Sequence, residues 1–309
     1  NQYGNIEVFS LELPERRFVD GFTDSDKTSL QSAIALAGGN YAEKQVSIAL
    51  YGEPNEYNVS QITNMDELFQ YTSFNEPINN WDTRNVTSMY QTFRLCSFNQ
   101  DISKWDTSKV TQMGLMFDQN TAFNQNINTS VQERDYGNGN IEKYVAWDVS
   151  KVTQFSSMFA SGSSNKSVFN GDISNWNTSS AIYMDNMFKN NDVFNTQIGE
   201  SNVDFTSDGL DISYNAWNVS SCSNFSNMFA GASKFNNGIQ NDIADQNNVG
   251  NPLKFTFKET GSSGDPPRCD YMFDGAQVFN APVYQWTNTD SINRMDSMFK
   301  NAYKFKQEV

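Results

Sequence analysis

Carboxylates are the only abundant groups in this sequence that could catalyse a reaction or bind a metal ion. The 309-residue chain has no histidine and only three cysteines. The absence of histidine excludes histidine-based triads, histidine acid–base catalysis and histidine metal ligands. The nucleophile elbow, the phosphate-binding loop and the dinucleotide fingerprint are also missing. A carboxylate pair acting on a polysaccharide stays open, but we expect a protein that is not an enzyme.

Two groups of aspartates could supply oxygen ligands to a calcium ion. They are Asp20, Asp24 and Asp26, and Asp204, Asp208 and Asp211. Neither group has the spacing of an EF-hand loop. We prefer a helix cap at Thr23 to Asp26 and a solvated polar loop at 204–211, and therefore expect no cofactor.

The three cysteines fall at positions that favour buried thiols. Cys222 occupies a position that holds Val110 elsewhere, Cys269 replaces a methionine, and Cys96 lies between two phenylalanines. Free cysteine is among the most buried residue types. We prefer three free thiols to a disulfide with one cysteine left over.

Most of the chain consists of copies of one repeating sequence unit, which must position the residues named above. The unit reads Trp-Asp/Asn-Thr/Val-Ser-x-Val-Thr-x-Met-x-x-Met-Phe, a short polar gap, then Phe-Asn-x-x-Ile. All six tryptophans occupy its first position: Trp81, Trp105, Trp147, Trp176, Trp217 and Trp286.

Two phenylalanines recur in every copy of the unit. The first is Phe69, Phe93, Phe117, Phe159, Phe188, Phe229, Phe273 and Phe299. The second is Phe74, Phe98, Phe123, Phe169, Phe194, Phe235, Phe279 and Phe305. The minimal period of about 24 residues is typical of solenoids, whereas a propeller blade needs roughly 40.

The spacing within the unit predicts a short helix and a short strand. Met113, Met116 and Phe117 stand at i, i+3 and i+4, which places them on one face of a helical turn. Thr111 precedes them and could cap that helix. The segment Ile102 to Trp105 favours a strand. We therefore predict an α/β repeat solenoid of about eight leucine-rich-repeat-like units with an N-terminal α/β cap.

The chain divides into a capping segment, residues 1–56, and the repeat solenoid, residues 57–309. The cap contains an alternating run at Ile6 to Leu13 and an amphipathic helix from about Asp26 to Ala37 that stops at Gly38-Gly39. Its apolar face consists of Leu30, Ala33, Ile34 and Ala37.

An asparagine follows the second phenylalanine in seven units: Asn75, Asn99, Asn124, Asn170, Asn195, Asn236 and Asn280. The same turn recurs at every level of a stacked solenoid. Inward asparagines there could satisfy backbone groups that the turn leaves unpaired. We predict a structural ladder, since a catalytic residue would be needed once.

The unit resembles the BspA-like repeat of surface proteins and mycoplasma-type lipoproteins, a distant relative of leucine-rich repeats. The resemblance covers roughly residues 57–309, and the leader segment Phe22 to Asp26 is also similar to that family's. Tyr57 and Cys269 depart from the pattern, and the seventh unit has lost its tryptophan. The resemblance implies a surface location and a role in adhesion, not a reaction.

Insertions lengthen three units near residues 128–146, 199–216 and 240–260. Each enters between the Phe-Asn turn and the next tryptophan position, so we expect them on one edge or face of the solenoid. Their aromatic residues form a candidate interaction surface: Tyr136, Tyr144, Phe205, Tyr214, Phe255 and Phe257. Packing of these rings onto the solenoid is an equal alternative. Ile141 and Ile212 compete with Ile127 and Ile198 for the strand position.

The sequence of the last unit predicts that this end of the solenoid contacts another chain or a further part of a longer parent protein. Its apolar core positions have no cap in the sequence, and an uncapped solenoid end exposes its core. The candidate end-to-end residues are Met295, Met298, Phe299 and Phe305.

Charge and composition limit the partners. A net charge of -15 argues against nucleic acid and anionic membrane surfaces, and no apolar run reaches the roughly 20 residues of a membrane span. We expect a non-enzymatic, extracellular, cell-surface or virion-surface protein. It would serve as a structural or adhesive element through protein–protein contacts or self-association, including a filament or larger assembly. The alternative is a glycan-binding module.

Overall fold

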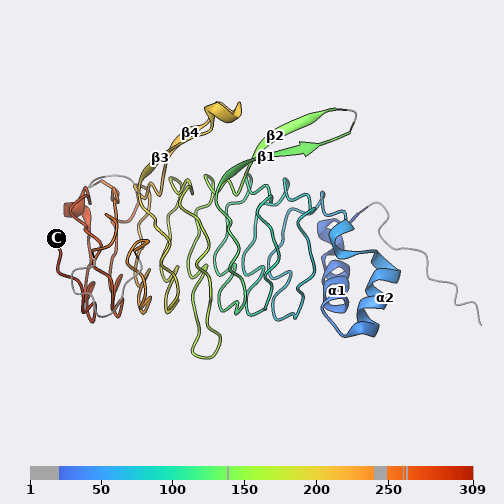
Figure 1. Ribbon diagram of the computed structural model, residues 1–309, viewed down its shortest axis with the longest axis horizontal. Coiled ribbons are helices and arrows are strands. Elements are labelled where there is room, and N and C mark those ends of the chain that lie inside the picture. Colours follow the sequence, from blue (N-terminus) through green and yellow to red (C-terminus); the bar gives the residue numbers. More distant parts are fainter. Residues whose placement is uncertain (1–20, 138, 240–248, 260, 262–263, 309) are drawn as a thin grey trace, which may run out of the picture.

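The computed structural model describes residues 21–137, 139–239, 249–259, 261 and 264–308. Its elements are η1 (Asp24–Asp26), α1 (Lys27–Ala37), α2 (Tyr41–Tyr51), η2 (Pro54–Glu56), β1 (Ser130–Asp135), β2 (Ile141–Ala146), β3 (Ser201–Asp204), η3 (Thr206–Asp208), β4 (Ser213–Ala216) and η4 (Thr289–Ser291). The two α-helices lie at one end of an elongated row of chain turns, and β1–β2 and β3–β4 project from one edge of it (Figure 1). We call each turn of the row, with its pair of phenylalanines, a coil.

The prediction of an α/β solenoid with eight helix-plus-strand units is wrong. Within the described residues, α-helix is confined to α1 and α2, and the strands form two antiparallel sheets of two strands each. The remaining described chain consists of turns, short 3-10 helices, isolated bridges and irregular segments. Neither the Met-x-x-Met-Phe segment nor the Ile-x-x-Trp segment forms a regular element.

Left-handed residues prevent the Met-x-x-Met-Phe segment from becoming a helix. Leu115 and Gln119 have φ values of 58° and 56°, and such residues interrupt a right-handed helix. Alternate amides from Met113 to Gln119 donate to carbonyls of the next coil, between Gln154 and Ala160, at 2.8–3.0 Å. Of the intervening amides, those of Met116 and Asp118 donate to the carbonyl three residues earlier, and that of Gly114 donates to the side chain of Gln112. The methionines and phenylalanine still face inward, because consecutive turns also return to one face every three or four residues.

Isolated parallel bridges connect neighbouring coils. They pair Asn64↔Ser88, Ser88↔Gln112, Gln112↔Gln154, Gln154↔Tyr183, Tyr183↔Asn224, Asn224↔Arg268 and Arg268↔Arg294. The predicted helix-capping threonines belong to this connection. The amide of Thr111 donates to the carbonyl of Thr87 at 2.9 Å, and its hydroxyl donates to the same carbonyl at 3.3 Å. Their role is therefore to join coils.

Columns of aromatic rings fill the interior of the row. Successive first phenylalanines lie 4.7–5.6 Å apart between ring centroids, and successive second phenylalanines lie 5.6–6.3 Å apart. The six tryptophans are also buried. The indole N–H of Trp176 donates to the carbonyl of Ile127 at 2.8 Å, which satisfies its polar atom inside the core. The repeated aromatic residues thus form a buried core, except at Phe299 and Phe305, which are partly exposed.

The helix predicted near the start of the chain is confirmed as α1. Leu30, Ala33, Ile34 and Ala37 form its buried face, and Thr23 and Asp26 form the expected cap through a hydrogen bond of 3.0 Å from the Thr23 amide. The Ile6 to Leu13 run and Asp20 lie outside the described residues.

The second helix, α2, was not predicted. Asn40 caps it by accepting from the amides of Ala42 and Glu43, an Asn-x-x-Glu signal that resembles a capping box. Ser47 on this helix donates to the carbonyl of Ala33 at 3.0 Å. Its hydroxyl also lies 3.0 Å from that of Tyr57, which connects the helix pair to the first coil.

The three cysteines are free and buried, as predicted. Burial raises the pKa of the Cys96 and Cys222 thiols to about 12 and also raises the pKa of Cys269. A buried, protonated thiol reacts poorly, since the thiolate is the nucleophile.

A thiol-specific chromogenic reagent should therefore label the native protein slowly near neutral pH, and all three thiols rapidly after unfolding without reductant. Stability should also fall as the pH rises through 9.0 toward about 12, because the unfolded thiols lose protons there and the folded ones keep them. Chemical unfolding curves at several pH values check the second effect. Only one reactive thiol after unfolding would contradict the assignment and indicate a disulfide.

Candidate interaction edge

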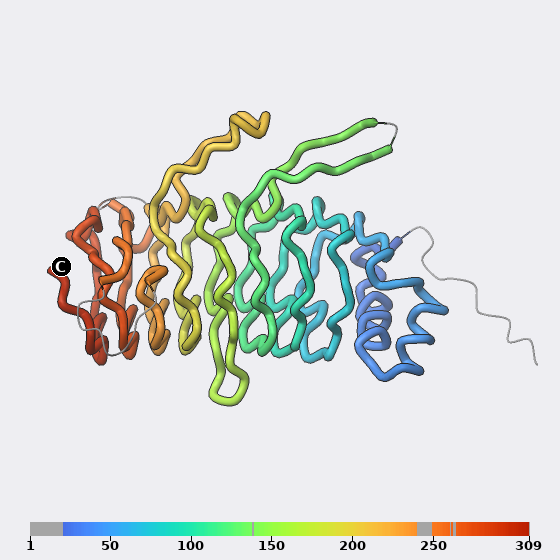
Figure 2. Tube along the Cα trace, in the orientation of Figure 1, coloured from blue at the N-terminus to red at the C-terminus, as the bar shows by residue number. Residues whose placement is uncertain are grey.

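Both hairpins leave the row of coils directly before a tryptophan. Strand β2 ends at Ala146, next to Trp147, and β4 ends at Ala216, next to Trp217. These two tryptophans have left-handed backbones, each with a φ of 49°, which turn the chain from the strand back into the coil. Figure 2 shows both hairpins on the same edge, inclined toward the N-terminal end. We call the hairpins and the coil residues beneath them the hairpin edge.

Arg134 attaches the β1–β2 hairpin to the coils. Its guanidinium lies 3.1 Å from Asp106 and 3.9 Å from Asp82 on two successive coils, and 3.3 Å from Glu142 on β2. The same guanidinium lies over the ring of Tyr144, 4.4 Å from its centroid. Several partly buried charges thus hold the outer half of this hairpin against the coils, and a network of this kind contributes more than an isolated surface pair.

A second arginine connects the coil to the end of the hairpin. Arg84 lies over the Tyr136 ring at 5.1 Å from its centroid, and its guanidinium bonds to Asp82. Burial alone would raise the pKa of Asp82, but the hydrogen bonds and charge of Arg84 outweigh it and lower that pKa. The carboxylate of Asp82 therefore stays ionised and holds this cluster together at neutral pH.

Tyrosine hydroxyls join the hairpins to backbone carbonyls of the row. Tyr144 donates to the carbonyl of Lys104 and Tyr214 to that of Asn175, each at 2.6 Å. Burial raises the pKa of Tyr214 to about 12. The hairpins also contact each other, since the ammonium of Lys143 donates to the carbonyl of Asp208 at 2.8 Å.

The six aromatic residues predicted as an interaction surface do not form one exposed set. Tyr136 is 46% exposed, whereas Phe205, Phe255 and Phe257 are buried. Tyr144 and Tyr214 are partly buried. Most of these rings therefore attach the insertions to the row, which is the packing alternative. Tyr136 is the most exposed of the six, although Arg84 lies over its ring.

The third insertion does not form a hairpin in its described part, residues 249–259. Phe257 packs edge-on against Trp286, 5.3 Å between centroids, and 5.4 Å from Phe225. It fills space in the unit that has lost its tryptophan. The rest of this insertion, 240–248 and 260, lies outside the described residues.

Two exposed isoleucines on the hairpin edge were missed as surface residues. Ile141 is 56% exposed and Ile212 is 37% exposed, while Ile127 and Ile198 are buried. Ile127 and Ile198 therefore occupy the core position of their units, although neither lies in a strand. The sequence did contain a signal that Ile141 and Ile212 are exposed. Both lie inside insertions, farther from the second phenylalanine than the isoleucine of the other units.

The ladder asparagines connect coil to coil, but most do not face inward. From Asn99 to Asn280, the backbone amide of each ladder asparagine donates to the side-chain Oδ1 of the ladder asparagine in the preceding coil, at 2.7–2.9 Å. Asn75, Asn124 and Asn170 are exposed, whereas Asn236 and Asn280 are buried. The inward orientation was wrong for the exposed members, because the ladder runs along the outside of the turn.

Inward asparagines do exist, at a position that the sequence analysis missed. Asn120 and Asn191 are buried three residues after the first phenylalanine of their units. The Oδ1 of Asn120 accepts from the amides of Ala122 and Phe123, both at 2.9 Å. The Asn-Asp/Thr-x-Phe spacing before the second phenylalanine is the available signal.

The four residues proposed for an end-to-end contact differ in exposure. Met295 is exposed, Met298 is buried, and Phe299 and Phe305 are partly exposed. The two phenylalanine rings stack at 4.1 Å and continue the aromatic columns. Their contact with another subunit stays a prediction.

The aspartates considered as calcium ligands form hydrogen bonds within the protein and do not gather into a binding site. Asp24 accepts from the amide of Thr63 at 2.9 Å, and Asp204 accepts from the amide of Thr206 at 2.8 Å. Within the described part of the chain, no three histidine, cysteine or acidic residues converge as metal ligands would. Across the same residues, none of the helices combines the length and hydrophobicity needed to cross a bilayer.

Comparison with known proteins places the chain in a family without assigning it a function. No curated protein and no solved structure matches it. A family model described as a Mycoplasma protein of unknown function, DUF285, matches residues 40–137, 129–262 and 267–309. These matches cover the coils and both hairpins. The chain therefore belongs to this DUF285 family of Mycoplasma proteins of unknown function.

Proposed function

We propose that this chain is a non-enzymatic extracellular or surface protein that acts as a structural or adhesive element and contacts protein partners through the hairpin edge. The supporting observation is that two hairpins leave the same edge and are bonded both to the coils and to each other. Arg134 and Tyr144 hold the first hairpin, and Tyr214 holds the second. Such attachment reduces the conformational entropy that a binding surface loses when it meets a partner.

The exposed residues of this edge suit a protein surface. Tyr136 and Ile141 stand near the end of the first hairpin, with 46% and 56% of their surfaces exposed. Tyrosine beside an aliphatic residue, surrounded by charged groups such as Glu142 and Lys143, is typical of the centre and rim of a protein interface. The net charge of -15 disfavours nucleic acid and anionic lipid as alternatives.

The resemblance of the unit to BspA-like repeats supports a surface location. The recurring Trp, Met-x-x-Met-Phe and Phe-Asn positions carry that resemblance. It concerns proteins displayed on cells, where contact with other surfaces is the common role. An external position on a cell or virion is therefore part of the proposal.

Beads coated with the chain should adhere to cultured cells or to one another. Protease treatment of the target surface should abolish adhesion, and periodate oxidation of its glycans should leave it unchanged. The double variant Tyr136→Ser/Ile141→Ser should lower bead binding by roughly tenfold or more, since central interface residues often contribute 2 kcal/mol each.

The matched control is Tyr71→Ser/Tyr303→Ser, which removes two more exposed tyrosines away from the hairpins. Equal loss in both variants would indicate nonspecific adhesion. Loss of adhesion after periodate but not after protease would favour the glycan-binding alternative at this edge.

A further inference from the structure

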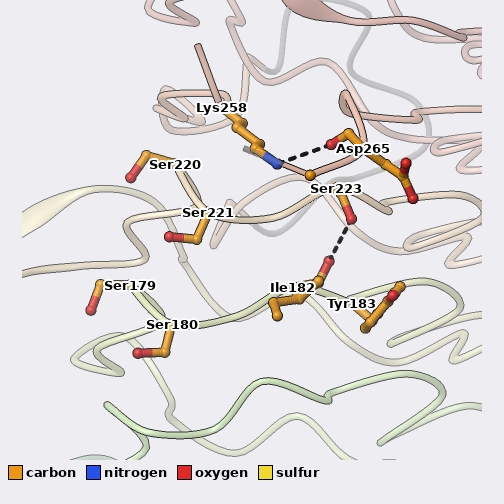
Figure 3. A pocket seen from close by; sticks show the side chains of 10 residues that line it. Ser179, Ser180, Ile182, Tyr183, Ser220, Ser221, Ser223, Lys258 and Asp265 are labelled. Atoms are coloured by element: carbon orange, nitrogen blue, oxygen red, sulfur yellow. Dashed lines mark hydrogen bonds between the residues drawn. The ribbon is translucent and has the colours of Figure 1, made fainter. Parts of the chain in front are cut away.

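A groove of about 700 Å³ lies where the fifth, sixth and seventh units meet. Its walls include five serines, one lysine and one aspartate: Ser179, Ser180, Ser220, Ser221, Ser223, Lys258 and Asp265. Figure 3 shows Lys258 above Ser220 and Ser221, with Ser179 and Ser180 beyond them. The groove is separate from the aromatic columns and from the two hairpins.

Sequence differences between units create this groove. The third and fourth units carry Lys109 and Lys151 at the position that Ser180 and Ser221 occupy in the fifth and sixth. The two serines leave space that a long side chain would fill. The seventh unit also takes a longer route, from Phe257 to Cys269, than the other units take across the same part of the coil.

Lys258 places a largely buried positive charge at the groove. Only 8% of its surface is exposed, and its ammonium donates to the backbone carbonyl of Asp265 at 3.1 Å. In the part of the chain that the structure describes, no carboxylate lies within ion-pair distance of it. A buried charge without a counter-ion is costly, so an anionic group in the groove would be stabilised by this ammonium.

The serines supply neutral hydrogen-bonding groups beside that charge. Among the described residues, the hydroxyls of Ser179, Ser180 and Ser221 make no hydrogen bond to protein atoms, whereas that of Ser223 donates to the carbonyl of Ile182. A serine hydroxyl can both donate and accept, as the hydroxyls of a sugar do. Tyr183, 38% exposed, adds an aromatic ring to the same wall.

We propose that this groove binds an acidic sugar residue. Its carboxylate or sulfate group pairs with Lys258, and its hydroxyls bond to the serines of the fifth and sixth units. A volume of about 700 Å³ is in the range of small-molecule sites. A single lysine does not suit a nucleic acid, which requires a row of cations. This binding does not depend on the protein contacts proposed for the hairpin edge.

The test compares methyl β-glucuronide with methyl β-glucoside by ligand-detected NMR on the whole chain. The glucuronide should bind, and the neutral glucoside should bind at least roughly tenfold more weakly, because a charge-assisted hydrogen bond is lost. Lys258→Met should reduce glucuronide affinity by a similar factor. Glucose 6-sulfate is tested in the same way and shows whether the groove prefers a sulfated sugar or a sugar with a carboxylate.

Lys151→Met is the matched control, since Lys151 is exposed on the same turn two units before Ser221, and it should leave affinity unchanged. Ser221→Gln provides a second variant in case Lys258→Met fails to fold. It copies Gln61 of the first unit at an exposed position, and it should block binding by filling the groove. Tyr136→Ser/Ile141→Ser should bind the glucuronide normally.

Three results would overturn the proposal. One is equal binding of the glucuronide and the glucoside. Another is unchanged affinity in both Lys258→Met and Ser221→Gln. The third is binding of sodium sulfate as tight as that of either acidic sugar, which would leave the serines without a role in recognition.

Discussion

Replacing Phe117 by alanine should lower the free energy of unfolding by about 3–5 kcal/mol. The Phe117 ring is fully enclosed and stacks on Phe123 at 4.0 Å, on Phe93 at 5.4 Å and on Phe159 at 5.6 Å. Its removal leaves a cavity in the column of first phenylalanines, beside Phe123 of the second column, and the coils on either side are fixed by backbone hydrogen bonds and cannot close it. Urea unfolding followed by tryptophan fluorescence gives the difference.

The control for this change is Tyr303→Ala. Tyr303 is 73% exposed, so its loss should alter the unfolding free energy by no more than about 0.5 kcal/mol. An unchanged unfolding midpoint in Phe117→Ala would contradict the packing described for the columns.

Asn120→Ala should be the second most damaging single change, at about 2–4 kcal/mol, since each stranded buried polar group costs about 1–3 kcal/mol. Asn120 is 1% exposed. Its Oδ1 holds the amides of Ala122 and Phe123, and its Nδ2 donates to the carbonyls of Phe93 and Phe98 at 3.3 Å. Alanine removes this partner from the two amides and from the Phe98 carbonyl where water does not reach, while the Phe93 carbonyl still accepts from the Cys96 thiol.

Asn124→Ala separates burial from hydrogen bonding as the cause. Asn124 also accepts from the next coil, through the amide of Asn170 at 2.7 Å, but both residues are exposed. Water can replace that bond, so we expect a cost of about 1 kcal/mol or less. Equal losses in Asn120→Ala and Asn124→Ala, measured by the same unfolding curves, would refute the role assigned to burial.

The repeat pattern was sufficient to identify the aromatic side chains that every unit buries. The recurrence of Trp, Met-x-x-Met-Phe and Phe predicted the aromatic interior, and the shared entry point of the insertions predicted that they lie on one edge, but not that two of them form hairpins. Burial depends on which positions return to the same face, and repetition over many units makes those positions visible. The helix α1 was also predictable, because its face and its cap are local features.

The backbone conformation of the unit was not predictable from the same pattern. A helical turn and a pair of tight turns both bring positions i, i+3 and i+4 to one face. The choice between them depends on hydrogen bonds to the next coil, which local spacing does not record. A weak signal was present: the position that holds left-handed Gln119 is glycine at Gly231 and Gly275, and glycine favours that conformation.

The candidate sites, like the fold, could be predicted only in part. Tyr136 was identified correctly as an exposed ring, but Phe255 and Phe257 were not, because the loss of one tryptophan gave these rings space inside the row. The groove at Lys258 was not predicted, since it depends on small side chains in two units and on a longer chain segment in a third. No single segment carries that information.

The far-ultraviolet circular dichroism of this protein should be weak and close to that of an unfolded chain, because the coils contain almost no helix or strand to produce a signal. The near-ultraviolet signal depends instead on fixed aromatic packing, which the stacked rings supply along the whole row. A molten globule keeps the far-ultraviolet signal and loses the near-ultraviolet one. We expect the native state of this protein to show the inverse signature, with a weak far-ultraviolet and a strong near-ultraviolet signal, so that loss of the near-ultraviolet signal would report its unfolding.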